Sequence, residues 1–326
     1  MINKRTLLLA TGAALAGRGA LAQATYPDRP IRVIVGYAPG GGVDIVARLM
    51  TEPMRQALGQ PLIVENKPGA SAMIGAQAVA RAAPDGYTLL MAAAGEIAAN
   101  PALLKQRMTY DPARELTPIS LVGTVPNVLV VDPRLPIRTP AELVAYAKAN
   151  PGKLSYASSG IGNPQHLAGE LLNRMAGTDI LHVPYKGATP ALTDVAAGRV
   201  SMNFSSLGPA LPLIQDRKLR AVAVTSRERL PQLQDVPAIA EAPSLTEYEL
   251  LNWFGVFAPA ATPAPVVARL QEALAAVLRD PGLQAKLAEQ GAIPHAMSQA
   301  EFRSFVEAET RKFTRIIEDA NITPEG

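Results

Sequence analysis

Apolar positions in this chain form short unbroken runs that alternate with runs at helical spacing. The clearest case is residues 32–50, RVIVGYAPGGGVDIVARLM, where an apolar run, three glycines and an apolar helical face follow one another. Short apolar runs bounded by turns predict buried strands, and apolar residues three to four positions apart predict amphipathic helices. This stretch therefore predicts a strand that passes through a glycine turn into a helix.

The turn itself consists of Gly40, Gly41 and Gly42. Glycine allows a sharp turn and lets a ligand approach the backbone closely. The first N–H groups of a helix have no partner within the helix, and the helix dipole is positive at that end. Two interpretations fit this stretch taken alone: an anion-binding site, and an ordinary strand-to-helix turn in which the glycines serve only the backbone.

The same order of strand, small-residue turn and helix returns twice. Strands are expected over 61–66 and 87–92, and a helix is expected over 71–83 with Ser71 as its N-cap. A third helix is expected after residue 92. Three strand–helix units in succession predict a mainly parallel sheet whose ligands gather at the carboxyl ends of the strands.

A second lobe is predicted beyond the long apolar stretch 119–131, which suits a strand that leaves one sheet and enters another. Residues 154–177 repeat the opening pattern, and residues 253–259 predict the return crossing. Capping boxes predict helix starts at Pro140 and after Ser298. The chain is thus predicted to be an α/β protein with lobe 1 at 23–123 plus 250–326, lobe 2 at 124–249, and a ligand cleft between them.

The N-terminal segment has the features of an export signal. Lys4 and Arg5 precede an apolar run, and Ala20–Leu21–Ala22 resembles a cleavage site, so residues 1–22 are expected to be removed and the mature protein to lie in the periplasm. No later segment has the roughly 18 uninterrupted apolar residues of a membrane-spanning helix. Without the three basic residues of the signal, 28 basic residues balance 28 acidic ones. The zero net charge argues against a nucleic-acid partner.

Several kinds of chemistry are disfavoured by what the sequence lacks. There is no cysteine, and His166, His182 and His295 lie at no metal-ligand spacing, so no metal site is expected. Neither Gly-x-Gly-x-x-Gly nor a phosphate-binding Gly-Lys-[Ser/Thr] loop is present. Gly-x-Ser-x-Gly is also missing. A serine hydrolase using Ser159 and His166 remains an enzyme alternative.

Nearly the whole mature chain consists of a recognisable series of segments: YPDRPIRVIVGYAPGGGVDIVAR, VENKPGASAMIGAQAVARAAPDGYTLL, NPALL, YASSGIGNPQHLAGELL, HVPYKGATPALTDVAAGRV and WFGVFAPAATP. In this order they resemble the Bug receptors, periplasmic solute-binding proteins associated with tripartite tricarboxylate transporters. The resemblance implies a type II-like, two-lobed periplasmic binding protein that closes like a flytrap on a small organic acid. It further implies delivery of the acid to membrane subunits of a transporter, without catalysis or a cofactor.

The resemblance also assigns binding residues by position. They are Pro39, Gly40, Gly41, Gly42, Val43 and Asp44 in the first loop, Ser71 in the second, Ser158, Ser159, Gly160, Gly162 and His166 in the second lobe, and Tyr185 in the Pro-Tyr-Lys-Gly signature. Main-chain N–H groups are expected to hold the carboxylate. Asp44 is expected to order its loop or cap the helix rather than touch an anion.

Two departures from the family pattern bear on the ligand. Ala92–Ala93–Ala94–Gly95–Glu96 stands where many relatives carry a Ser/Thr-rich turn, and Ser205 stands where amino-acid-binding relatives often carry Asp. Gly95, Glu96 and Ser205 are therefore expected to influence which acid is bound. A mono- or dicarboxylic acid without an amine is favoured. A role in signalling, with a sensor kinase as partner, is the alternative to transport.

Overall fold

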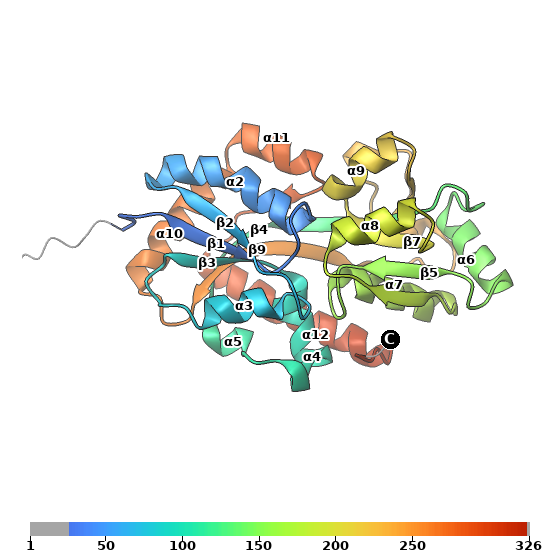
Figure 1. Ribbon diagram of the computed structural model, residues 1–326, viewed down its shortest axis with the longest axis horizontal. Helices are drawn as coiled ribbons and strands as arrows, with labels where there is room; N and C mark the ends of the chain where they lie inside the picture. The colour runs from blue at the N-terminus through green and yellow to red at the C-terminus, as the bar shows by residue number, and fades with distance from the viewer. Residues whose placement is uncertain (1–25, 325–326) are drawn as a thin grey trace, which may run out of the picture.

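The computed structural model describes residues 26–324, so the predicted signal at 1–22 lies outside the described residues. Figure 1 shows two lobes side by side, with the strands β4 and β9 passing between them. One continuous sheet follows the order β2-β1-β3-β9-β4-β7-β5-β6, and β8 and β10 pair with β4. Within residues 26–324, no helix combines the length and hydropathy needed to cross a membrane.

The first lobe is built on three parallel strands. Its elements are β1 (Ile31–Val35), α2 (Gly42–Leu58), β2 (Leu62–Asn66), α3 (Met73–Ala80), β3 (Thr88–Ala93), the π-helix η1 (Gly95–Ala99), α4 (Asn100–Leu103) and α5 (Pro112–Glu115), followed later by α10 (Ala264–Leu278), α11 (Pro281–Glu289), β10 (Ile293–Pro294) and α12 (Gln299–Asp319). Strand β1 pairs in parallel with β2 and β3. The predicted strand–helix units are confirmed here.

The second lobe has its own parallel strands. Its elements are α6 (Pro140–Ala149), β5 (Ser155–Ser158), α7 (Pro164–Ala176), β6 (Leu181–Pro184), α8 (Ala188–Ala196), β7 (Met202–Ser206), α9 (Leu207–Gln215) and β8 (Arg220–Val224). Strand β5 pairs in parallel with β6 and β7. The predicted helix start at Pro140 is confirmed, with Thr139 as N-cap, and the opening pattern predicted for 154–177 is confirmed by β5 and by α7, which has Asn163 as its N-cap.

Two long strands connect the lobes. In β4 (Leu116–Val131), the part up to Pro126 pairs with β9 (Leu251–Pro259), and the part from Asn127 pairs with β7. Both pairings are antiparallel; for β4 and β9 this is because β4 leaves the first lobe and β9 returns to it. The mainly parallel arrangement expected from the sequence therefore holds for the outer strands, while the centre of the sheet is antiparallel. The numerical lobe boundaries remain a prediction.

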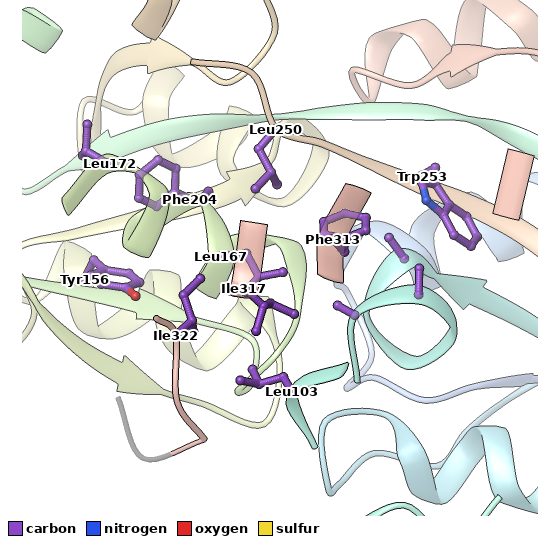
Figure 2. Packing of buried hydrophobic residues seen from close by; sticks show 14 of the residues in the cluster. Leu103, Tyr156, Leu167, Leu172, Phe204, Leu250, Trp253, Phe313, Ile317 and Ile322 are labelled. Carbon is purple, nitrogen blue, oxygen red and sulfur yellow. The ribbon is translucent and has the colours of Figure 1, made fainter. Parts of the chain in front are cut away.

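Three apolar clusters form the core. One lies within the first lobe and contains Val33 and Met50, and another lies within the second lobe and contains Val128 and Leu192. The third runs across both lobes, and Figure 2 shows residues of both, including Trp253, Leu167 and Ile317, in this cluster. Helix α12 and the residues after it thus connect the lobes on one side of the sheet.

The helix expected from Ser71 begins differently. Ala70, Ser71 and Ala72 have φ values of 46°, 54° and 67°, in the left-handed region. A side chain caps a helix from a residue with extended backbone, so Ser71 cannot take that role here. Ala72 is the residue before α3, which has no side-chain cap. The prediction that Ser71 is the N-cap is therefore wrong.

The capping box at the start of α12 is confirmed. The Ser298 hydroxyl accepts from the Glu301 N–H at 3.3 Å, and the Glu301 carboxylate accepts from the Ser298 N–H at 2.8 Å. We expect Ser298→Ala to lower the free energy of unfolding by about 1 kcal/mol, the usual cost of a lost N-cap. Urea denaturation measures it. Ser304→Ala, at an exposed position of the same helix, is the control, and an equal effect of the two variants would contradict the assignment.

Candidate functional site

Two cavities lie between the lobes. The first cavity has a volume of about 20 Å³ and is lined by Tyr37, Gly41, Gly42, Val43, Ala93, Ser159, Asn163, Pro164, Gln165, Ala188, Ser206, Asn252 and Phe254. The second cavity, about 200 Å³, is lined by Gly36, Tyr37, Gly69, Ala70, Ser71, Ala72, Ser159, Gly160, Ile161, Pro184, Tyr185 and Lys186. They share Tyr37 and Ser159. The first cavity has room for about one water molecule, so the lobes must separate before an organic molecule can enter it.

The first turn of α2 faces the first cavity. Gly41 is the N-cap residue of this helix, and among residues 26–324 no side chain accepts from the N–H groups of the first turn. Gly41, Gly42 and Val43 all line the cavity. A helix that begins without a side-chain cap leaves its first N–H groups available to an anion, and the helix dipole favours one. The backbone thus supplies donors to the cavity without any positive side chain.

Asp44 orders the loop before α2, as the sequence predicts. Its carboxylate accepts from the Gly40 N–H at 2.9 Å, from the Asn66 amide at 2.9 Å and from the Arg48 guanidinium at 3.0 Å. Burial alone raises the pKa of Asp44, but the hydrogen bonds from Arg48, Gly40 and Asn66 outweigh it and bring the pKa below its ordinary value. The carboxylate of Asp44 is occupied by these three donors and does not line either cavity.

Residues 158–162 of the second lobe, here called the serine loop, form most of their hydrogen bonds with neighbouring residues of the same segment. The Ser159 N–H donates to Gln165 Oε1 at 2.9 Å, the Gly160 N–H donates to Ser158 Oγ at 3.2 Å, and the Gly162 N–H donates to His166 Nδ1 at 3.1 Å. At the start of α7, Asn163 accepts from two N–H groups. In this conformation these backbone N–H groups already have partners, and their binding to an anion stays a prediction.

Two amide side chains offer N–H donors to the first cavity. Gln165 Oε1 accepts from Ser159, and Asn252 Oδ1 accepts from the Trp253 N–H at 2.8 Å and the Ala94 N–H at 3.3 Å. A backbone N–H bonds only to the oxygen of an amide, so each NH2 group is left as the free end. Neither NH2 group bonds to another described residue, and both side chains line the first cavity. The cavity therefore collects donors from both lobes.

Glu96 lies behind the wall of the cavities. It is fully buried, and its carboxylate accepts from the Tyr37 hydroxyl at 2.7 Å and from the Ala93 N–H at 2.9 Å. Burial raises the pKa of Glu96 to about 7. Tyr37 lines both cavities, so Glu96 acts on the site through this tyrosine. It does not face the cleft, which removes it as a direct partner for a ligand ammonium group.

A pair of stacked histidines supports the serine loop from behind. The rings of His166 and His182 lie 4.0 Å apart, and His182 Nε2 is 2.7 Å from Ser158 Oγ. Burial lowers the pKa of His166 to about 3, with a smaller contribution from His182, and it lowers the pKa of His182 to about 4. Both rings are therefore neutral at ordinary pH. Ser158 and His166 position the loop and line neither cavity.

This arrangement weakens the hydrolase alternative. The Ser159 hydroxyl bonds to Gln165 and Asn163, while His166 Nδ1 accepts from Gly162, so this serine and this histidine do not form a nucleophile–base pair. Ser158 does contact His182, but Ser158 is fully buried in this closed conformation. Within residues 26–324, no group of three His, Asp or Glu side chains could hold a metal ion.

The structure brings together only part of the predicted binding set. Predicted residues that line a cavity are Gly41, Gly42, Val43, Ser71, Ser159, Gly160 and Tyr185. Those that lie behind or beside the walls are Pro39, Gly40, Asp44, Gly95, Glu96, Ser158, Gly162, His166 and Ser205. Ser205 is fully buried and its hydroxyl donates to the Ser206 carbonyl, whereas the neighbouring Ser206 lines the first cavity. Adjacent residues of a strand point to opposite faces, which explains the difference.

The sequence reasoning missed Tyr37, Gln165, Ser206 and Asn252. Local signals existed for Gln165, which follows the Asn-Pro start of α7, and for Tyr37, which stands directly before the glycine loop. Asn252 reaches the site from β9, far along the chain, and no local pattern marks it. Its position follows only from the pairing of β9 with β3 and β4.

Glycines on both sides let the lobes approach closely. A Cβ at Gly42 would lie 2.6 Å from Ser206 Oγ, a Cβ at Gly187 would lie 2.8 Å from Ala38 Cβ, and a Cβ at Gly162 would lie 2.5 Å from Asn100 Oδ1. Real Cβ atoms do not come so near, so each of these contacts requires glycine. The described conformation is therefore a closed one, and its close packing depends on glycine, which has no Cβ, at these positions.

Comparison with known proteins identifies the family. The sequence profile of the tripartite tricarboxylate transporter family receptor matches residues 46–322. The chain belongs to this receptor family. The receptor is 33% identical over 321 residues to the protein BugT of Bordetella pertussis, covering 98% of both chains. The predicted resemblance to the Bug receptors is confirmed, and with it the periplasmic binding-protein fold.

Solved structures similar to the receptor include two with organic acids. An R. palustris protein solved with adipate has a TM-score of 0.88 and 37% identity, covering 91% of this chain and 99% of its own. MatC from Rhodopseudomonas palustris, with bound malate, has a TM-score of 0.84 and 32% identity, covering 90% and 100%. The family and these neighbours are binding proteins. The comparisons do not support a sensor kinase as partner.

We expect Gly42→Ala to hold the lobes of the receptor apart, because its Cβ would overlap Ser206 in the closed form. Small-angle X-ray scattering should give this variant a larger radius of gyration than the wild type. Gly41→Ala is the matched control, since a Cβ there meets the Ala38 carbonyl at 3.5 Å and Ala188 Cβ at 4.0 Å, both ordinary contacts. Equal radii for all three proteins would contradict the closed-state fit.

We expect Glu96→Gln to remove one component of the pH dependence of stability. Because burial raises the pKa of Glu96 from 4.5 to about 7, the folded state binds more protons between these values. The contribution of Glu96 to the free energy of unfolding is therefore fully present below pH 4.5 and falls as the pH rises through 7, by at most about 1.4 kcal/mol per pH unit.

Urea denaturation of both proteins from pH 5 to 8 measures this component as the difference between them. The difference is needed because His166 and His182, with lowered pKa values, act in the opposite direction below pH 6.5. Glutamine can still bond to the Tyr37 hydroxyl, so the local contacts survive. A difference that does not vary with pH would show that Glu96 is ionised throughout.

Proposed function

We propose that the receptor captures a small organic carboxylate without an amine between its lobes. The observation that carries this proposal is the set of donors at the first cavity. The uncapped first turn of α2 contributes N–H groups, Gln165 and Asn252 contribute NH2 groups, and Ser206 contributes a hydroxyl. A carboxylate offers only acceptors, and it matches such a set.

The strength of these contacts fits a transport receptor. A hydrogen bond to a charged group contributes about 1.5–3 kcal/mol, and a micromolar complex corresponds to about 8 kcal/mol. Four or five such bonds are therefore of the required size after the costs of association are met. Binding relies on local geometry, which accords with the balanced charge of the predicted mature chain.

The lining also supports the absence of an amine on the ligand. Neither cavity is lined by Asp or Glu, while the second cavity has Lys186 at its wall. An ammonium group would find no carboxylate there. The neighbours solved with adipate and malate hold acids of this kind, which supports the same class for this chain.

Closure of the lobes is the proposed signal for delivery. The hinge lies where β4 changes partner between Pro126 and Asn127, near the predicted lobe boundaries at 123/124 and 249/250. Closing brings Gly42 to Ser206 and presents one joined surface to the membrane subunits of the transporter. Residues 1–22 direct export to the periplasm. The receptor performs no catalysis in this proposal.

We expect a thermal-shift screen of the mature receptor to find ligands among organic acids such as adipate and malate. The carboxylate raises the melting temperature because it binds only the folded state. Gly42→Ala should lose most of the shift, since it cannot close. Stabilisation only by amines, sugars or metals would contradict the proposal.

Transport and hydrolysis are separated by two further measurements. Uptake of the identified acid into vesicles carrying the membrane subunits should require the receptor, and Gly42→Ala should not support it even with the acid in excess. The hydrolase alternative instead predicts turnover of an ester that Ser159→Ala abolishes. Turnover of this kind would contradict the transport proposal.

A further inference from the structure

A third cavity lies on the first lobe, away from the cleft. We call it the α12 pocket; its volume is about 360 Å³, and it is lined by Ile97, Pro101, Asp111, Pro112, Ala113, Leu116, Pro118, Phe257, Arg303, Val306, Glu307, Thr310 and Arg311. It shares no residue with the two cavities between the lobes. Figure 1 shows the helices α4, α5 and α12 that surround it on one side of the sheet.

The floor of the α12 pocket is apolar. Ile97, Leu116 and Phe257 come from η1, β4 and β9, and each is almost completely buried, at 3%, 3% and 2% exposure. Val306 and the prolines extend this surface toward the rim. Pockets of about 300–1,000 Å³ with mostly apolar walls and a few polar groups are typical small-molecule sites.

The rim carries charge on one face of α12. Arg303, Glu307 and Arg311 lie four residues apart and so project from the same side of the helix. Within residues 26–324, none of the three forms an ion pair. The fourth charged group, Asp111, accepts from the Ala113 N–H at 3.0 Å and is occupied as a helix cap. The rim thus carries two arginines and two carboxylates beside an apolar floor, and of the two carboxylates Asp111 is already bonded to a backbone N–H.

A second large groove differs from the α12 pocket in that its arginines have carboxylate partners. It lies between residues 226–232 and 288–294, and its two arginines are both engaged by glutamates. Arg229 pairs with Glu241 at 2.6 Å, and Arg227 lies within 3.7 Å of Glu247 and Glu249. Only in the α12 pocket do two arginines without a carboxylate partner adjoin apolar walls, among the cavities described here.

We propose that the α12 pocket is a second binding site, specific for an amphipathic monocarboxylate. The apolar body of the acid lies against Ile97, Leu116 and Phe257, and its carboxylate meets Arg303 and Arg311 at the rim. Burying the apolar body removes hydrocarbon surface from water, and guanidinium groups bind carboxylates with strong, directional hydrogen bonds. A small dicarboxylate is a poor fit, because one of its charges would enter the apolar floor.

The test titrates the mature receptor with octanoate, a straight-chain monocarboxylate, by isothermal titration calorimetry. Arg303→Gln/Arg311→Gln should weaken binding about tenfold or more, the loss expected for at least one charge-assisted hydrogen bond. Val306→Trp should abolish binding by filling the pocket. Octan-1-ol, which has the same length and no charge, should bind more weakly than octanoate.

Two controls separate this site from the cleft and from general effects of charge. Arg315→Gln removes an arginine of α12 that does not line the pocket, and it should bind octanoate like the wild type. Gly42→Ala impairs the cleft and should also retain octanoate binding. The proposal is overturned if wild-type receptor binds no octanoate at millimolar concentration, if the double arginine variant binds normally, if Gly42→Ala abolishes binding, or if octan-1-ol binds as tightly.

Discussion

The absence of a side-chain cap at the start of α2 is the feature on which the rest of the site depends. Unsatisfied N–H groups are costly unless water or a ligand bonds to them, so an uncapped helix end is kept open for a partner. Asp44 holds the preceding loop in place without covering those groups. In the opposite lobe the N–H groups of Ser159, Gly160 and Gly162 are already bonded, and Gln165 and Ser206 contribute side-chain donors.

Much of the fold could be predicted from the sequence because its signals are local. Each strand–turn–helix unit consists of consecutive residues, and so do the capping box at Ser298 and the long crossing strand that contains Gly123 and Pro126. Apolar periodicity fixes the type of each element, and a strand long enough to serve two sheets implies two lobes. The antiparallel centre of the sheet follows from the same connectivity once the return strand is placed.

The detailed site could be predicted only in part because it depends on pairing between distant segments. Asn252 meets the glycine loop through the register of β9, and the choice between Ser205 and Ser206 depends on a single-residue alternation within β7. Ser71 fails as a cap because three residues in succession adopt left-handed backbone, which no composition rule anticipates for Ala and Ser. Glu96 is predicted from the sequence to influence the choice of acid, but its side chain is buried behind Tyr37.

The neighbour of Asn252 gives the protein a built-in optical probe. Trp253 is the single tryptophan in the chain, it is fully buried, and its ring packs edge-on against Phe302 and Phe305. The backbone N–H of Trp253 donates to the Asn252 side-chain oxygen, and Asn252 lines the first cavity. A rearrangement of that amide on the arrival of a solute therefore acts on the backbone of the residue that carries the single indole, which makes intrinsic emission a label-free means of following occupation of the cleft.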